Sequence, residues 1–80
     1  MYLNNNNGES YKVLAFVQSG NENGNNAYLL ETAQGNYIVA LGWSDKYKSW
    51  SYGHYHMTNK ESAIDDFNAQ VRKIAWYVIG

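Results

Sequence analysis

The sequence contains no cysteine, which excludes disulfide bonds and cysteine-ligated zinc as sources of stability. Its 80 residues predict one domain that spans residues 1–80. A chain of this size buries only about 60% of the surface that its unfolded form exposes, so the core must be small. Tight packing or self-association then has to stabilise the fold, and we expect a homodimer.

Long hydrophobic runs are also absent. No apolar stretch approaches the roughly 20 residues that cross a membrane as a helix. The first residues have neither the basic start nor the apolar core of a signal peptide. These absences predict a cytoplasmic protein without a membrane partner.

Charge of either sign is scarce. Six Lys and Arg stand against seven Asp and Glu, which gives a net charge of −1. Non-specific binding to nucleic acid depends on basic side chains that neutralise phosphates, so this balance argues against a nucleic-acid partner. The chain is also not acidic enough to imitate DNA by charge alone.

Catalytic and metal-binding motifs are missing as well. His54 and His56 share one face of a predicted strand, which is half of a metal site, but no third ligand stands at a recognisable spacing. Asp65 and Asp66 are adjacent on a predicted helix and point in different directions, and no serine has a base nearby in the sequence pattern. We therefore expect neither enzyme activity nor a metal ion or other cofactor.

Aromatic residues make up 16% of the chain, and the segment 37–57 holds two of the three Trp and four of the eight Tyr. Two runs rich in β-favouring residues, YIVALGW and WSYGHYHM, flank the polar turn SDKYKS, a pattern that predicts a β-hairpin. Two earlier runs, at 11–18 and about 27–32, predict two further strands. Residues 1–10 and the loop 19–26 are rich in Asn and Gly and are expected to be flexible.

A helix is predicted at about 59–76. Its apolar residues recur at alternating steps of three and four and form one stripe: Ile64, Phe67, Val71, Ile74 and Val78. Thr58 and Glu61 are spaced as a capping box, and Asn59 is a competing cap. The tail 76–80 also has high β propensity, so helix, strand and extended tail all stay open there. The expected fold is α+β, a four-stranded antiparallel meander followed by one C-terminal helix packed on one sheet face.

The turns set the expected strand register. A two-residue turn at 34–35 puts Leu30 opposite Val39, and the later hairpin puts Val39 opposite His54. One face then holds Tyr28, Leu30, Thr32, Tyr37, Val39, Leu41, Trp43, Trp50, Tyr52, His54 and His56. The other holds Leu29, Glu31, Ile38, Ala40, Gly42, Ser51, Gly53, Tyr55 and Met57. Because the second face has small residues at its centre, we expect the helix to pack there.

The first face would then be left uncovered. Its candidate partner-binding residues are Trp43, Tyr47, Trp50, Tyr52 and His54. A large exposed apolar patch usually marks an interface, which favours protein–protein contact. Two alternatives stay open: the aromatic residues are core and the helix packs on their side, or together with Lys46 and Lys48 they form a platform for single-stranded nucleic acid.

Four short segments carry a resemblance: 28–31 (YLLE), 35–40 (GNYIVA), 50–55 (WSYGHY) and 63–67 (AIDDF). Together they resemble small orphan proteins of bacterial phages and mobile elements, a group that includes anti-CRISPR and other anti-defence inhibitors. The likeness covers residues 11–67. It implies a stoichiometric inhibitor, often dimeric, that binds a host protein in the bacterial cytoplasm, with a CRISPR effector nuclease as a candidate target. It implies no site residue.

The expected function is therefore that of a non-enzymatic, protein-binding inhibitor. The alternative is a small nucleic-acid-binding accessory protein that uses the aromatic sheet face. Salt distinguishes the two, because phosphate contacts weaken steeply with ionic strength and aromatic protein contacts do not.

Overall fold

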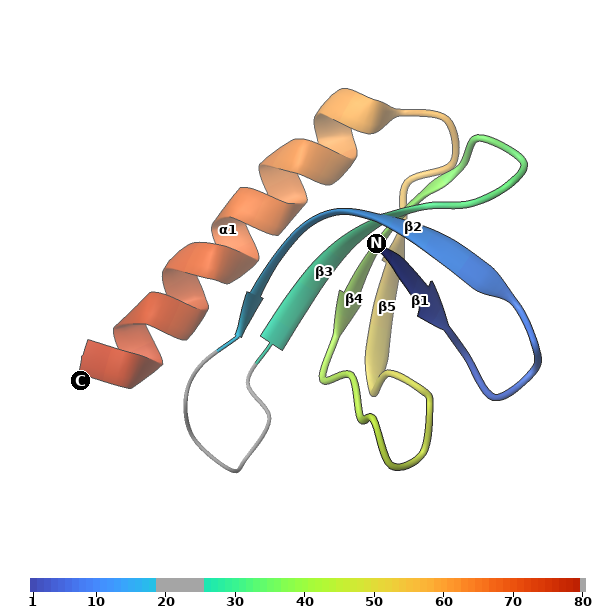
Figure 1. The fold of residues 1–80 in the computed structure, drawn as a ribbon. Helices are drawn as coiled ribbons and strands as arrows, with labels where there is room; N and C mark the ends of the chain where they lie inside the picture. The colour runs from blue at the N-terminus through green and yellow to red at the C-terminus, as the bar shows by residue number, and fades with distance from the viewer. Residues whose placement is uncertain (19–25, 80) are drawn as a thin grey trace.

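The structure is a computed structural model that describes residues 1–18 and 26–79, with side chains described as far as residue 74. This part of the chain contains strands β1 (Tyr2–Asn4), β2 (Ser10–Gln18), β3 (Asn26–Glu31), β4 (Tyr37–Leu41) and β5 (Tyr52–Tyr55) and helix α1 (Lys60–Ile79). The strands form one antiparallel sheet in chain order, and α1 lies along one side of it (Figure 1). The predicted α+β fold with a C-terminal helix is confirmed, with one strand more than expected. Most of the predicted loop 19–26 lies outside the described residues.

The additional strand is β1, which lies within the segment predicted to be a flexible lead-in. It pairs with β2, with Leu3 opposite Tyr11. The Asn-rich residues that follow form the connecting turn, in which Asn5 Oδ1 accepts hydrogen bonds from the backbone N–H groups of Asn7 and Glu9 at 3.0 and 2.9 Å. Asparagine side chains commonly close turns in this way. The Asn-rich segment is therefore a turn between two strands and not a flexible lead-in.

The turn between β3 and β4 differs from the prediction. Its loop has three residues, 33–35, whose flanking residues are joined by a backbone hydrogen bond of 2.9 Å, and Gly35 has a φ of +82°. A glycine in the left-handed region at the end of the loop is typical of three-residue hairpins. The extra loop residue moves the register by one, so Leu30 pairs with Ile38 and not with Val39. A shift of one residue exchanges the two faces of a strand, which is why the predicted faces of β3 are wrong relative to β4.

The register between β4 and β5 agrees with the prediction, because Val39 pairs with His54. Just after β4, however, Gly42 has a φ of +71°. Glycine adopts this conformation readily, and the residue after it, Trp43, lies in the cluster on the side of the sheet opposite to Val39. The strand alternation that the prediction extended to Trp43 therefore stops at Gly42.

The sheet is coiled, so that the turn after β1 reaches the loop between β4 and β5 (Figure 1). The backbone N–H of Asn6 donates to the carbonyl of Lys48 at 2.9 Å. The rings of Tyr11 and Trp50 meet edge to face, with their centroids 5.3 Å apart. We call the side of the sheet that carries Tyr11 and Trp50 the concave face, and the side that carries α1 the helix face.

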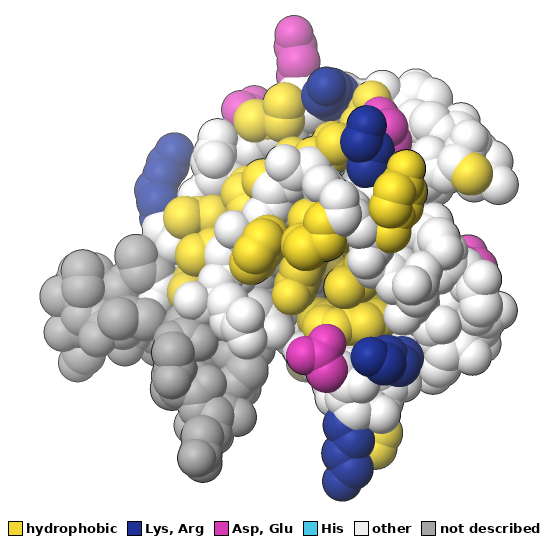
Figure 2. All heavy atoms as spheres, viewed as in Figure 1, with side chains coloured by type: hydrophobic (Ala, Val, Ile, Leu, Met, Phe, Trp, Pro, Cys, Tyr) yellow, Lys and Arg dark blue, Asp and Glu magenta, His cyan; other side chains and the backbone are white. Residues whose placement is uncertain are grey.

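Each face of the sheet has its own buried cluster. The concave-face cluster contains Tyr11, Tyr28, Leu30, Ile38, Ala40 and Trp43. The helix-face cluster contains Ala27, Leu29, Val39, Ala63, Phe67 and Ile74. The helix thus packs on Leu29 and Val39, and the expectation that it covers Ile38 and Ala40 is wrong. In the view of Figure 2, hydrophobic side chains gather in the middle of the molecule, with charged side chains around them.

Helix α1 begins close to the predicted position. Of the two predicted caps, Asn59 is the one that the chain uses, because its Oδ1 accepts a hydrogen bond from the backbone N–H of Ser62 at 3.0 Å. Of the predicted stripe, Phe67 and Ile74 belong to the helix-face cluster, and Ile64 and Val71 pack against it. The fifth, Val78, lies beyond the described side chains. The helix continues to Ile79, so most of the tail that the sequence left open is helical.

In the described part of the chain, no helix is both long and apolar enough to cross a membrane.

Candidate functional site

The five residues predicted to bind a partner do not share one surface. Trp43 is only 6% exposed and belongs to the concave-face cluster, and Trp50 is half-buried against the same cluster. The indole N–H of Trp43 donates to Asp45 Oδ1 at 2.9 Å. Tyr52 and His54 belong to β5, and His54 is directed to α1 on the helix face. The predicted aromatic face is therefore divided between the two sides of the sheet.

A buried asparagine holds Trp43 in place. Asn26 Nδ2 donates to the carbonyl of Trp43 at 3.0 Å, and Asn26 Oδ1 accepts from the backbone N–H of Trp43 at 2.8 Å. Buried backbone groups need such partners, and here one side chain supplies both. A single asparagine at the end of an Asn-rich segment carries no sequence signal for this role.

Four large hydrophobic side chains remain exposed on and around β5. They are Tyr47, Tyr52, Tyr55 and Met57, each between 63% and 72% exposed. Strand β5 is last in the sheet order, so among the described residues its outer edge has no paired strand. Hydrophobic side chains next to free backbone N–H and C=O groups are the features by which sheet edges bind other chains. We call these four side chains together with the free edge the β5 surface.

Two of the predicted binding residues, Tyr47 and Tyr52, belong to the β5 surface. Tyr55 and Met57 are not predicted as exposed, because the expected helix would have covered them. The alternation with His54 and His56 puts Tyr55 and Met57 on one face, but it does not show which face the helix covers.

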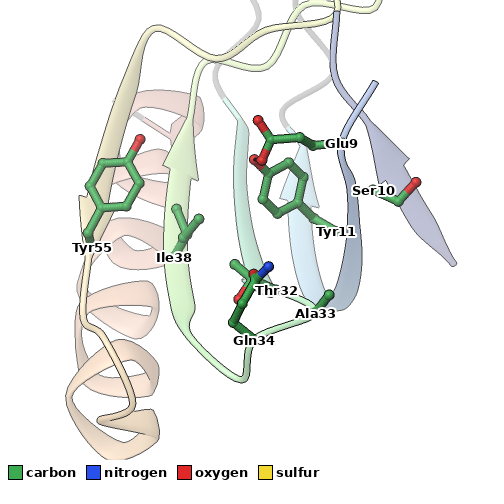
Figure 3. Close-up of a pocket in the computed structure, with 8 residues that line it drawn as sticks. All are labelled: Glu9, Ser10, Tyr11, Thr32, Ala33, Gln34, Ile38 and Tyr55. Carbon is green, nitrogen blue, oxygen red and sulfur yellow. Dashed lines mark hydrogen bonds between the residues drawn. The ribbon is translucent and has the colours of Figure 1, made fainter. Parts of the chain in front are cut away.

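A groove of about 390 Å³ lies on the concave face beside β5, with α1 behind the sheet (Figure 3). Its floor is Ile38, and Tyr11 and Tyr55 stand on either side of this floor (Figure 3). The carboxylate of Glu9 lies next to Tyr11 (Figure 3). The groove thus combines an apolar floor and two aromatic side chains with one negative charge and the neutral polar side chains of Ser10, Thr32 and Gln34.

The absence of a side chain at Gly53 leaves space for the rings of Trp50 and Tyr55. A Cβ atom at this position would lie 2.8 Å from Trp50 Nε1 and 2.8 Å from the hydroxyl oxygen of Tyr55. Such distances are too short for real atoms, so a side chain here would displace one of the two rings. The small residues that predicted a docked helix leave space for Trp50 and Tyr55 instead.

Tyr11 and Glu9 form the polar pair of the groove. The hydroxyl of Tyr11 donates to Glu9 Oε2 at 2.8 Å, and Asn5 Nδ2 donates to the hydroxyl oxygen at 3.4 Å. Burial, the hydrogen bond to Glu9 and the negative charge of Glu9 raise the pKa of Tyr11 to about 12. The neutral phenol therefore persists at any physiological pH and fixes the carboxylate at the groove.

A second polar cluster joins β5 to α1 on the helix face. His54 Nδ1 and His56 Nε2 both lie 2.8 Å from Asp66 Oδ2, and Gln70 Nε2 donates to Asp66 Oδ1 at 3.2 Å. His56 Nδ1 lies 3.1 Å from Ser62 Oγ. Burial alone would raise the pKa of Asp66, but hydrogen bonds from His56, Gln70 and His54 outweigh it and hold this pKa below its usual value.

In this geometry the cluster has a structural role, because it joins β5 to α1. Each imidazole directs a nitrogen at the same carboxylate oxygen, and the described residues contain no group of three or more His, Cys, Asp or Glu arranged to hold a metal ion. The sequence pattern does not predict Asp66 as the partner of the two histidines. Its spacing of three from Ala63 and four from Gln70, beside the apolar stripe, was the available signal.

No family model matches the sequence, and comparisons with curated proteins and with solved structures found no similar protein.

Proposed function

We propose that this protein is a non-enzymatic protein-binding module that docks its partner along the β5 surface. The observation that carries the proposal is the exposure of Tyr47, Tyr52, Tyr55 and Met57 on and around β5, whose outer edge has no paired strand among the described residues. Tyrosine is enriched among the residues that dominate binding energy at interfaces, because its ring buries a large area and its hydroxyl finds a partner. A partner strand added at the β5 edge would supply backbone hydrogen bonds in addition to these contacts.

The class of partner comes from the resemblance to phage and mobile-element inhibitors. We propose that the partner is a host defence protein, with a CRISPR effector nuclease as the first candidate, and that binding blocks it stoichiometrically. Strand addition suits this role, since it requires neither a cofactor nor a chemical step.

The alternative, a nucleic-acid-binding accessory protein, has support from the loop between β4 and β5. There Lys46 Nζ lies 5.4 Å from the centroid of the Tyr47 ring, and Lys48 is exposed nearby. The burial of Trp43, however, removes one of the rings that a stacking platform would use. The protein-binding proposal is therefore preferred.

The test uses a double variant of the β5 surface, Tyr47→Ala with Tyr52→Ala. Tyr2→Ala is the matched control, because Tyr2 is 64% exposed on β1, the strand at the other edge of the sheet. Tagged wild-type protein is used to capture a partner from a bacterial lysate, and the purified partner is then titrated against all three proteins. We expect the double variant to bind at least about 30-fold more weakly, since loss of one anchoring tyrosine commonly costs about 2 kcal/mol.

Two results would contradict the proposal. One is a wild-type protein that retains no partner, and the other is a double variant that binds as tightly as the Tyr2→Ala control. Binding that falls about a thousandfold between 50 and 200 mM salt would indicate phosphate contacts and would favour the nucleic-acid alternative.

A further inference from the structure

We propose that the groove on the concave face is a binding site for an arginine side chain of the partner protein. This assignment rests on the proposed protein-binding function and names the chemistry that the groove selects. The supporting features are the composition of the groove, its charge and its position beside the β5 surface.

The charge of the groove is negative. Among the described residues that line it, Glu9 is the only one with a formal charge. Tyr11 donates to Oε2 of Glu9, and the structure shows no hydrogen bond to Oε1 from the described residues. A guanidinium group can donate to a carboxylate through two parallel N–H groups, so Glu9 offers a complementary acceptor.

The walls of the groove suit the rest of an arginine side chain. Tyr11 and Tyr55 stand on either side of Ile38 (Figure 3). Of the two rings only Tyr55 is exposed, and the planar guanidinium of arginine can stack on such a ring. Tyr11 and Ile38 are buried, so Tyr11 contributes its hydroxyl beside Glu9 and Ile38 the apolar base on which methylene groups can lie. A groove of about 390 Å³ has room for this side chain.

The position of the groove connects it to the β5 surface. Tyr55 belongs to both, because it is exposed on β5 and also lines the groove. A partner docked along β5 would therefore contact a residue that lines the same groove as Glu9. We infer that the β5 edge holds the partner backbone and that the groove selects one basic residue from it.

The experiment titrates the wild-type protein with N-acetyl-arginine methylamide and follows it by NMR. The reporters are the Ile38 methyl groups and the indole N–H of Trp50, which lies beside Tyr55 over Gly53. The indole N–H of Trp43 is the internal reference, because it is hydrogen-bonded to Asp45 and Trp43 does not line the groove. The matched neutral ligand is N-acetyl-citrulline methylamide, which has nearly the same shape without the charge.

We expect saturable shifts at Ile38 and Trp50 with the arginine compound and at least fivefold weaker binding of the citrulline compound. Glu9→Gln should weaken binding of the arginine compound at least fivefold. Glu61→Gln makes the same change of net charge in the first turn of α1 and should leave this binding unchanged.

Equal binding of the two compounds, shifts away from the groove, or an unchanged affinity in Glu9→Gln would overturn the assignment. These outcomes are separate from the test of the proposed function, because the NMR titration needs no partner protein. If the Tyr47 and Tyr52 double variant no longer binds the partner and the wild-type groove does not bind the arginine compound, the proposed protein-binding function is supported and the arginine site is contradicted.

Discussion

A single buried side chain, Asn26, fixes the position of Trp43 in this small domain. It is 5% exposed and its amide satisfies both backbone groups of Trp43, which follows the positive φ of Gly42. The chain leaves regular strand geometry at Gly42, so Trp43 needs a hydrogen-bond partner from elsewhere. Without Asn26, the placement of Trp43 in the concave-face cluster would leave two buried polar groups unpaired.

The first prediction follows from these two hydrogen bonds. Asn26→Ala should lower the free energy of unfolding by about 2–4 kcal/mol, because each unsatisfied buried group costs about 1–3 kcal/mol. Urea titration followed by Trp fluorescence measures the loss. Asn7→Ala, at an exposed position in the turn between β1 and β2, is the control. A loss below about 0.5 kcal/mol in Asn26→Ala, which is typical of surface changes, would contradict this role.

A second prediction at the residue scale concerns acid stability. Asp66 has a pKa below its ordinary value of 3.8 in the folded protein. A lowered folded pKa adds stability above the unfolded value, and this contribution is lost as the pH falls below 3.8 through the folded pKa. Wild type should therefore lose stability more steeply between pH 4 and pH 2 than Asp66→Asn does, as measured by thermal unfolding.

Asp65→Asn provides the matched control for this prediction, because Asp65 is the exposed neighbour of Asp66 on the same helix. It should keep the pH slope of the wild type. If Asp66→Asn also keeps that slope, the carboxylate does not tie α1 to β5 as the structure indicates.

Among the elements, the β4–β5 hairpin was predictable and the β3–β4 hairpin was not. Both runs of the later hairpin have strong β propensity, and a polar loop separates them, so its register follows from the pattern. In the earlier hairpin, a Gln-Gly pair fits a two-residue turn, yet Gly35 ends a three-residue loop. Propensity does not distinguish these turns, and an error of one residue is enough to exchange the faces of β3.

The candidate site could be predicted only in part for the same reason. Tyr47 and Tyr52 are exposed where the hairpin pattern puts them. Trp43 is buried, because the positive φ of Gly42 ends the strand alternation. The alternation of polar and apolar residues in a sequence does not show such a φ value. Glu9 and Tyr11 reach the groove through the coiling of the sheet, and strand patterns alone do not show which distant segments such coiling brings together.

The third prediction tests the docking of α1. Phe67 is buried between α1 and the helix face, so Phe67→Ala should cost about 3–5 kcal/mol through lost burial and the cavity that remains. Denaturant titration measures the change. The neighbouring Asn68 is exposed, and Asn68→Ala should have little effect. A Phe67→Ala protein within about 1 kcal/mol of wild type would mean that α1 is not docked as described.

At the scale of the whole molecule, the described part of this 80-residue chain forms two separate buried clusters, and the chain has no cysteine for disulfides. The sheet separates the two clusters and contributes side chains to both, since Leu30 belongs to one cluster and Leu29 to the other. The exposed tyrosines on β5 add apolar surface that neither cluster covers. A chain of this size with so much exposed apolar surface gains stability when it associates.

The fourth prediction is therefore a homodimer. Multi-angle light scattering at high micromolar concentration should give twice the mass of the chain, and a monomer mass there would contradict the prediction. The Tyr47 and Tyr52 double variant then locates the dimer contact. If the variant is a monomer, the second copy and the partner protein compete for the β5 surface; if it is still a dimer, that surface is free for the partner.

Strand β3 is buried over Asn26–Leu30 and lies between two paired strands, whereas β5 has exposed side chains and, among the described residues, no strand paired to its outer edge. In native-state hydrogen exchange, amides of β3 should therefore exchange only when the whole protein unfolds, and amides of β5 should exchange through smaller local openings. Hydrogen-exchange rates measured at several denaturant concentrations separate the two classes. The strand proposed to receive the partner is thus expected to open and close many times within the lifetime of a single folded molecule.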